Sequence, residues 1–338
     1  MNKLFPCTLL CCLLAAACAQ QNATQSTGET ARQYLDLWMS TMYPGVEMND
    51  DGIYIVEDTP GTGEEWSSDK SYVYIDYLVT ELDGTMYAYT DVRKAQQLGT
   101  YKYGNYYGPR FTQLGKDNSS AGLDALLKGM RKGGTRKAVI PSWMTTTSRY
   151  NTQAEYIKAC NTIAHRRYTV TLLGMSNDME QTEIDSLGNF MAHNYPDALP
   201  RESKNFTYGA LYFISDTTAF TEDTRRAADA EVSINYTGML LNGQVFDTTI
   251  EKVAKEAGIY QEGKTYSSQT VKFDEDADKI TLGGSSVIRG FRYGLDMMHW
   301  KGQSATFLFI SSLGYESTGS GNTIPPYSPL LFEVEILP

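Results

Sequence analysis

Residues 234–249 read INYTGMLLNGQVFDTT, residues 75–90 read IDYLVTELDGTMYAYT, and the two stretches align without a gap. The match runs from Val73 to Tyr107, which map onto the later copy at a constant offset of 159 residues. This offset is far longer than the period of a solenoid repeat. The repetition therefore predicts two domains that arose by duplication, rather than a repeat array.

Each copy has the sequence pattern of an antiparallel domain. Apolar and polar residues alternate, as in VSINYTGML, which predicts a half-buried strand. LDG and LNG, which end at Gly84 and Gly243, predict hairpin turns between such strands. Many strands with one short helix per copy indicate two α+β domains, which we place at residues 31–174 and 175–338.

A helix is predicted before the strands of each copy. Apolar residues with helical spacing are Leu35, Trp38, Met39 and Met42 in the first copy, and Ile184, Leu187, Phe190 and Met191 in the second. Thr182 with Asp185 has the spacing of an N-terminal capping box for the second helix. Each apolar stripe suits packing on its own domain, and an oligomerisation helix is the alternative.

Composition limits the classes of function. The chain has 338 residues, of which 41% are hydrophobic and 20% charged, as expected of a folded soluble protein. Its formal net charge of −11 argues against nucleic acid as a partner and does not favour anionic membrane surfaces. Its 24 tyrosines suit strands and the walls of binding clefts.

The N-terminus, MNKLFPCTLLCCLLAAACAQQ, has the features of an export signal. Lys3 is followed by an apolar run, Leu4–Ala17, that is too short for a comfortable transmembrane helix. LAAAC resembles a bacterial lipoprotein signal, so we expect residues 1–18 to be that signal, with Cys18 as the lipidated first residue of the mature protein. Polar residues 19–30 then form a flexible tether. An ordinary cleaved signal with an incidental cysteine is the alternative.

Cysteine and histidine usage argues against disulfides and metal sites. Cys7, Cys11 and Cys12 are removed with the signal, and acylation of Cys18 would leave Cys160 as the one free thiol. The three histidines are scattered: His165, His193 and His299. Their spacing gives no support to a zinc site or a histidine-based triad, and we expect no metal and no cofactor.

The second copy contains four motifs in a fixed order: INYTGMLLNGQVFDTT, VIRGFRYGLDMM, KGQSATFLFIS and LGYESTGSGNTIPPYSPLLFEVEIL. In these motifs it resembles the FKBP family of peptidyl-prolyl cis–trans isomerases. The resemblance covers about residues 231–338, with an insertion at roughly 250–270. The resemblance implies two FKBP-like domains, each an antiparallel sheet wrapped on a short helix, and isomerase activity in the second.

The resemblance also implies which residues form the pocket. Those with a catalytic role are Tyr236, Phe246, Asp247, Ile288 and Tyr315, and those that bind substrate are Val287, Phe291, Ile324 and Phe332. Phe291 stands where the family usually has a Trp floor. Asp278 lies near the place of a family aromatic residue that is not evident here. Asp247 is expected to hydrogen-bond Tyr236 rather than act as a base.

These residue types suit the reaction. Twisting an X–Pro amide must overcome a barrier of about 18–20 kcal/mol because resonance is lost. The twisted amide is less polar than the planar one, so a dry aromatic cleft favours the transition state. By resemblance, the Ile288 N–H and the Tyr315 hydroxyl hold the substrate carbonyl. Taken alone, however, Tyr236 or Phe332 could be a core residue, and Asp247 could cap a helix in TTIEKVAKEAG.

The first copy keeps the scaffold and departs from the pocket. Tyr77 and Tyr87 are aromatic, but Ala88 replaces Asp247, Leu123 takes the floor position and the Ile-Pro-Pro loop is absent. Its basic run, KGMRKGGTRK, does not match a phosphate loop and is better explained as a solvated strand and turn than as an anion site.

We therefore expect a lipid-anchored folding factor whose second domain isomerises proline-containing segments of exported proteins. Its expected location is the cell envelope, at the outer membrane or in the periplasm of a Gram-negative bacterium. The first domain is expected to bind or to act as a spacer. The alternative is a non-catalytic FKBP-like chaperone or a subunit of an envelope complex. A third interpretation, an anion- or carbohydrate-binding lipoprotein, is supported only by the basic run and the many tyrosines.

Overall fold

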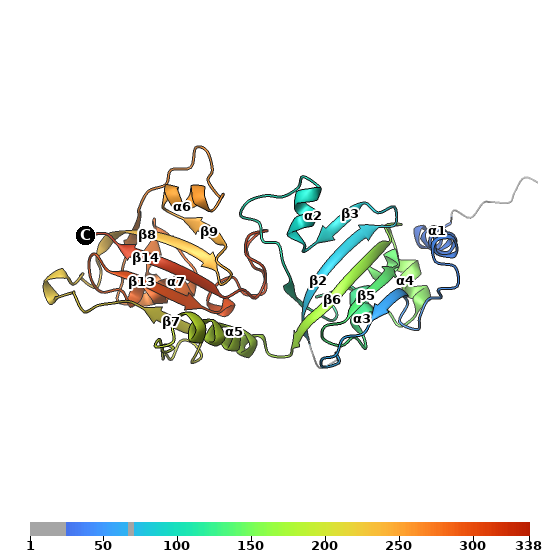
Figure 1. Cartoon of the computed structure of the whole chain (residues 1–338), viewed down its shortest axis with the longest axis horizontal. Helices are drawn as coiled ribbons and strands as arrows, with labels where there is room; N and C mark the ends of the chain where they lie inside the picture. The colour runs from blue at the N-terminus through green and yellow to red at the C-terminus, as the bar shows by residue number, and fades with distance from the viewer. Residues whose placement is uncertain (1–24, 67–70) are drawn as a thin grey trace, which may run out of the picture.

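The structure is a computed structural model that describes residues 25–66 and 71–338. The expected signal, Cys18 and the first half of the expected tether, residues 19–24, lie outside the described residues. Two antiparallel sheets lie side by side along the long axis of the molecule, with helices packed around each (Figure 1). The α+β prediction, with a helix before each sheet, is confirmed.

The first sheet has six strands in the order β1-β5-β6-β2-β3, with β4 paired to β2. Its strands are β1 (Tyr54–Thr59), β2 (Tyr72–Glu81), β3 (Met86–Tyr89), β4 (Arg110–Gln113), β5 (Thr135–Ile140) and β6 (Arg166–Ser176). Its helices are α1 (Thr27–Met42), α2 (Val92–Gln97), α3 (Ala121–Leu127) and α4 (Gln153–Ala159).

The second sheet has eight strands in the order β12-β11-β10-β8-β14-β13-β7, with β9 paired to β8. Its strands are β7 (Leu211–Ile214), β8 (Glu231–Leu240), β9 (Val245–Thr248), β10 (Gln269–Lys272), β11 (Thr281–Leu282), β12 (Ser285–Ser286), β13 (Ser304–Phe309) and β14 (Leu330–Ile336). Its helices are α5 (Met179–Asn194), α6 (Glu251–Glu256) and α7 (Arg289–Asp296).

The structural repeat is longer than the sequence match. The bounds of β2, β3, α2 and β4 coincide with those of β8, β9, α6 and β10 when 159 is added to each residue number. Both copies therefore contain the segment between β9 and β10 that the family resemblance marks as an insertion. Within it, Tyr101 stacks on Tyr107 with ring centroids 5.4 Å apart, and Tyr260 stacks on Tyr266 at 5.5 Å.

Both leading helices begin before the residues that the sequence suggested. The first turn of α1 contains residues 27–30, which were predicted to be tether, because the Ser26 hydroxyl accepts a hydrogen bond from the Glu29 N–H. Asp178, rather than Thr182, caps α5 by accepting a hydrogen bond from the Gln181 N–H. In both helices, the N-cap residue therefore lies earlier in the chain than the sequence pattern suggested, and the helix begins correspondingly earlier.

Each leading helix packs on its own domain. Leu35 and Met39 of α1 are buried in the core of the first domain, and Leu187 and Met191 of α5 in the core of the second. Buried His165 ties α1 to the first sheet, because its Nε2 lies 3.1 Å from the Ala31 carbonyl oxygen. Burial lowers the pKa of His165 to about 4, so this imidazole is neutral at neutral pH.

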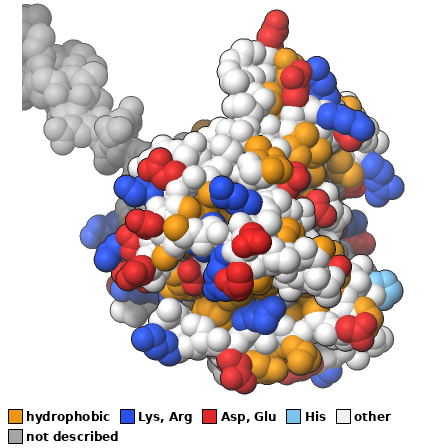
Figure 2. Space-filling model, turned by 90° about the vertical axis from the view of Figure 1, so that its left-hand side faces the viewer, with side chains coloured by type: hydrophobic (Ala, Val, Ile, Leu, Met, Phe, Trp, Pro, Cys, Tyr) orange, Lys and Arg blue, Asp and Glu red, His pale blue; other side chains and the backbone are white. Residues whose placement is uncertain are grey.

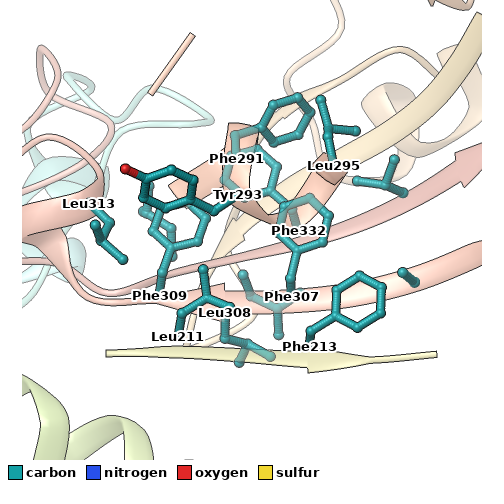
Figure 3. Close-up of a cluster of buried hydrophobic side chains, with 14 of the residues drawn as sticks. Leu211, Phe213, Phe291, Tyr293, Leu295, Phe307, Leu308, Phe309, Leu313 and Phe332 are labelled. Carbon is teal, nitrogen blue, oxygen red and sulfur yellow. The ribbon is translucent and has the colours of Figure 1, made fainter. Parts of the chain in front are cut away.

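The core of the second domain is largely aromatic (Figure 3). Helix α7 lies against β13, where a Cβ atom at Gly290 would come within 2.3 Å of the Phe309 ring and one at Gly294 within 2.4 Å of the Phe307 ring. These two glycines, one helical turn apart, let the helix backbone rest directly on the rings. The aromatic layer beneath α7 supports the site described below.

The outer face of the second domain carries acidic and basic side chains interspersed, with smaller hydrophobic groups between them (Figure 2). Among the described residues, no helix combines the length and apolar character that crossing a membrane requires.

Candidate active site

The nine predicted site residues lie together around one cavity of about 480 Å³ in the second domain. They are Tyr236, Phe246, Asp247, Val287, Ile288, Phe291, Tyr315, Ile324 and Phe332. They come from β8, β9, the start of α7, two loops and β14, so residues almost a hundred positions apart meet here. Four further lining residues were not singled out from the sequence: Leu282, Ser286, Ser320 and Thr323.

Gly238 makes room for the aromatic walls of this cavity. In β8 it pairs directly with Phe332 of β14. A Cβ atom at this position would lie 2.6 Å from the Phe246 ring and 2.7 Å from the Phe332 ring. Both distances are shorter than any non-bonded carbon contact, so a side chain here would displace the rings.

A β-bulge in β9 brings two consecutive residues to the cavity. Residues next to each other in a regular strand face opposite sides of the sheet. Here Gly238 pairs with Asp247 while Met239 pairs with Val245, so Phe246 is the extra residue of the bulge. As a result, Phe246 and Asp247 both line the cavity.

Three donors surround the Asp247 carboxylate. The Tyr236 hydroxyl donates to Oδ2 at 2.6 Å, the hydrogen bond expected from the sequence. The Thr248 N–H donates to Oδ1 at 3.0 Å, and the Lys264 ammonium does so at 3.1 Å. This arrangement uses Asp247 to orient Tyr236 and leaves the carboxylate poorly placed to accept a substrate proton.

Lys264 is a contribution of the inserted segment that sequence analysis missed. Its ammonium also lies 5.2 Å from the centre of the Tyr266 ring, a residue of the repeated tyrosine stack. The ion pair with Asp247 is about 40% exposed on both sides, so solvent screens it. Lys264 lies 17 residues after Asp247 in the chain, and no sequence pattern indicated that the two side chains would be in contact.

Two tyrosine hydroxyls face the cavity as protonated donors. Burial, followed by the hydrogen bond to Asp247, raises the pKa of Tyr236 above its usual range. Burial, followed by the charge of Asp247, also raises the pKa of Tyr315. The Tyr315 hydroxyl makes no hydrogen bond to any described residue, so it is available to a ligand.

The floor of the cavity consists of aromatic rings that pack edge to face. Phe291 is 3% exposed, and its ring lies 4.8 Å from that of Phe332 and 5.6 Å from that of Tyr236, at interplanar angles of 63° and 69°. Figure 3 shows Phe291 and Phe332 as part of the aromatic core under α7. The floor is therefore closely packed, although Phe291 is smaller than the Trp of the family pattern.

Helix α7 begins at the cavity. Ile288 is its N-cap residue, and the Ile288 N–H makes no hydrogen bond within the described part of the chain. A free N–H at a helix N-terminus is a natural donor to a carbonyl oxygen. Asp278, by contrast, does not line the cavity; its Oδ1 lies 3.3 Å from Arg292 and 3.4 Å from the Tyr293 hydroxyl.

Buried Glu183 of α5 anchors the loop that carries Tyr315. Its two carboxylate oxygens accept hydrogen bonds of 2.6 Å from the N–H and the hydroxyl of Ser311. Burial raises the pKa of Glu183. Farther along this loop, a Cβ atom at Gly319 would lie 2.3 Å from the Ile324 carbonyl oxygen. Only glycine therefore permits the tight turn that brings Ile324 to the cavity.

The equivalent positions of the first copy are arranged differently. Val79 takes the place of Gly238 and is 3% exposed, opposite Tyr168. Ala88 takes the place of Asp247 and pairs with Val79, as Asp247 pairs with Gly238. Tyr87 is 61% exposed, with the Arg166 guanidinium 4.1 Å from its ring centre. The first copy thus keeps the strand register, and Val79 places a side chain where Gly238 has none.

The basic run of the first copy is engaged in ion pairs. Lys128 pairs with Asp51 at 2.6 Å, Arg131 with Glu65 at 2.9 Å, Arg136 with Asp58 at 2.7 Å and Lys137 with Glu57 at 2.5 Å. The expectation of a solvated strand and turn holds for Lys128, Arg131 and Lys137, but not for Arg136, which is buried. Among the described residues, no group of three His, Cys, Asp or Glu side chains is placed to hold a metal ion.

Comparison with known proteins gives three findings. A family model described as FKBP-type peptidyl-prolyl cis-trans isomerase matches residues 222–337. A probable FKBP-type peptidyl-prolyl cis-trans isomerase of Haemophilus influenzae is 33% identical over 137 residues, which are 40% of this chain and 45% of that protein. An FK506-binding protein of Neisseria meningitidis is 31% identical over 107 residues, which are 32% of this chain and 77% of that protein.

Among solved structures, a peptidyl-prolyl cis-trans isomerase of Pseudomonas syringae is similar, with 21% identity and a TM-score of 0.31. The similarity covers 47% of this chain and 93% of that one. The chain spans less than half the length of the Haemophilus relative, and the family model lies within the second domain.

Substitutions at Asp247 separate its hydrogen bond from its ion pair. Asp247→Asn keeps an acceptor for the Tyr236 hydroxyl and loses the exposed ion pair, which is worth at most about 1 kcal/mol. We expect Asp247→Asn and Lys264→Met to keep the rate of X–Pro exchange, measured by NMR on a short peptide, within about threefold. Asp247→Ala also removes a hydrogen bond worth about 1.5–3 kcal/mol, so we expect a loss of about tenfold or more.

Equal losses in Asp247→Asn and Asp247→Ala would contradict this assignment, because they would make the charge, and not the orientation of Tyr236, the important property. Near-ultraviolet circular dichroism checks that each variant keeps its tertiary structure.

Proposed function

The chain belongs to the FKBP-type peptidyl-prolyl cis–trans isomerase family, and from this premise we propose that the cavity of the second domain isomerises X–Pro bonds in polypeptides. The observation that carries the proposal is the convergence of nine residues from distant parts of the chain on one aromatic cavity. Taken singly, each aromatic residue could serve the core, but core packing does not require the free Ile288 N–H and the free Tyr315 hydroxyl beside them.

The cavity suits a reaction in which no bond forms and no proton moves. Rotation about the X–Pro bond loses amide resonance, which costs about 18–20 kcal/mol and reduces the polarity of the amide. Aromatic walls solvate the twisted, less polar amide relatively better than water does. The proline ring would rest on Phe291, between Phe246 and Phe332.

The two free donors fix the substrate. The Ile288 N–H and the Tyr315 hydroxyl would each donate a hydrogen bond to a substrate carbonyl oxygen, so that the chain on one side of the proline is held while the other rotates. Tyr236, oriented by Asp247, completes the wall. The raised pKa values of both tyrosines keep their hydroxyls protonated at and above neutral pH.

The proposal is tested by the rate of cis–trans exchange of a short Ala-Pro peptide in the presence of the full chain. We expect the catalysed rate to be nearly flat from about pH 6 to 8, because none of the described residues that line the cavity is a histidine and the proposed mechanism uses no acid or base. We expect Phe246→Ala to lower the rate by about tenfold or more, because the proline loses one wall. A bell-shaped pH profile with a limb near an ordinary histidine pKa, or an unchanged rate in Phe246→Ala, would contradict the proposal.

We further propose that the whole protein is a folding factor for exported proteins, in which the first domain is a degenerate FKBP-like copy that binds clients or acts as a spacer. A non-catalytic chaperone, or a subunit of an envelope complex, is the second candidate. Two features favour it: the smaller Phe291 floor, and the Lys264 side chain beside the cavity. In the exchange experiment, this candidate predicts peptide binding without acceleration.

Location in the cell envelope is also a proposal, supported by the LAAAC stretch that ends at Cys18. Two or more acyl chains on this cysteine would hold the protein stably on a membrane. We expect the wild-type protein to sediment with membranes after cell fractionation and Cys18→Ala to shift to the soluble fraction. A wild-type protein that is already soluble would rule out the anchor.

A further inference from the structure

A second cavity, of about 400 Å³, lies between the two domains. We call it the interdomain groove. Its first-domain wall includes Tyr74, Tyr106 and Phe111, and its second-domain wall includes Leu240, Pro325 and Pro326. Figure 1 shows the loop before β4 and the loop before β14 facing each other between the two sheets, and both loops contribute lining residues. Apolar and aromatic side chains therefore line the groove on both sides, and polar side chains of α5, Thr182 and Ser186, complete the second-domain wall.

Direct contacts between the domains hold these walls in place. The Tyr106 N–H donates to the Asn322 carbonyl oxygen at 2.7 Å, and the Gln244 side-chain amide donates to the Gly104 carbonyl oxygen at 2.8 Å. Tyr327 packs edge-on against Tyr72, with ring centroids 5.3 Å apart. The groove therefore exists before a ligand arrives, which lowers the entropic cost of binding.

Arg110 places an uncompensated charge in this apolar groove. Its guanidinium lies 5.9 Å from the centre of the Tyr106 ring, and its buried Nε has no hydrogen-bond partner among the described residues. No described carboxylate forms an ion pair with it. Glu183 also lines the groove, but both of its oxygens are taken up by Ser311. A charge that is partly desolvated without a partner favours an anionic ligand group.

The interdomain groove and the isomerase cavity share one loop. Ile324 lines the cavity, whereas the next two residues, Pro325 and Pro326, line the groove. A polypeptide with its proline in the cavity could thus reach the groove with a few residues of extended chain.

We propose that the interdomain groove binds a second segment of the client polypeptide, in which an apolar or aromatic side chain adjoins a carboxylate. The apolar side chain packs between the two walls, and the carboxylate forms a charge-assisted hydrogen bond with Arg110. This inference rests on the proposed isomerase function and deepens it, because a client held in the groove raises the local concentration of its prolines at the cavity.

The probe for this site is a rhodamine-labelled, proline-free peptide, Gly-Phe-Leu-Asp-Gly, amidated at its C-terminus, with Asn in place of Asp as its partner. Fluorescence anisotropy measures binding of both peptides to the full chain. We expect the Asp peptide to bind about tenfold more tightly than the Asn peptide, and Arg110→Met to abolish this preference. Arg93→Met removes a guanidinium that is 81% exposed and is the matched control, which should keep the preference.

Equal binding of the two peptides to the wild-type chain would overturn the proposal, and this comparison needs no variant to fold. A preference that survives in Arg110→Met would also overturn it. The probe lacks proline, so its binding does not depend on isomerase activity. If the protein prefers the Asp peptide but does not accelerate X–Pro exchange, the proposed groove is supported and the proposed isomerase function is refuted. Phe246→Ala should leave the Asp preference intact, since Phe246 lies in the cavity and not in the groove; loss of the preference there would place the peptide in the cavity instead.

Discussion

The close approach of two aromatic rings to the backbone of Gly238 is the contact on which the cavity depends. With no Cβ atom at this position of β8, Phe246 and Phe332 can lie against the strand itself. Tyr236, two residues earlier on the same face of the strand, supplies a third ring. The polar arrangements follow from this geometry: the bulge that turns Phe246 inward also brings Asp247 within hydrogen-bonding distance of the Tyr236 hydroxyl.

Duplication kept the backbone of this arrangement and changed its side chains. Strand, turn and helix bounds repeat at one offset through four consecutive elements, so the scaffold does not depend on the pocket. In the first copy, Val79 occupies the space that Gly238 leaves open, and Ala88 cannot orient a tyrosine hydroxyl. The first domain instead presents Tyr106 and Arg110 to the second, across the loop that borders the cavity. The two copies thus contribute different surfaces to one molecule.

Periodicity and the internal repeat predicted the α+β class and the duplication, whereas the nine residues now found around one cavity were implied by the resemblance to the FKBP family. The alignment of the two copies also matched Val79 with Gly238. The consequence of this difference for the cavity could not be predicted, because the sequence does not show which aromatic rings pack against the backbone at that position. Lys264 could not be predicted, because the path of the inserted loop decides which side chain returns to Asp247. The position of Arg110 in the interdomain groove could not be predicted either, because the groove forms only where the two domains pack against each other.

The central claim, that the missing side chain at position 238 opens the catalytic cavity, is tested most directly by Gly238→Ala in the full chain. The measurement is the rate of cis–trans exchange of an Ala-Pro peptide by NMR, with Gly174→Ala as the matched control. Gly174 is also in a strand, and its added Cβ atom would meet its nearest neighbour at an ordinary 3.5 Å. We expect Gly238→Ala to lower the catalysed rate about tenfold or more while the protein stays folded, and Gly174→Ala to leave the rate unchanged. A folded Gly238→Ala protein with the wild-type rate would contradict the claim.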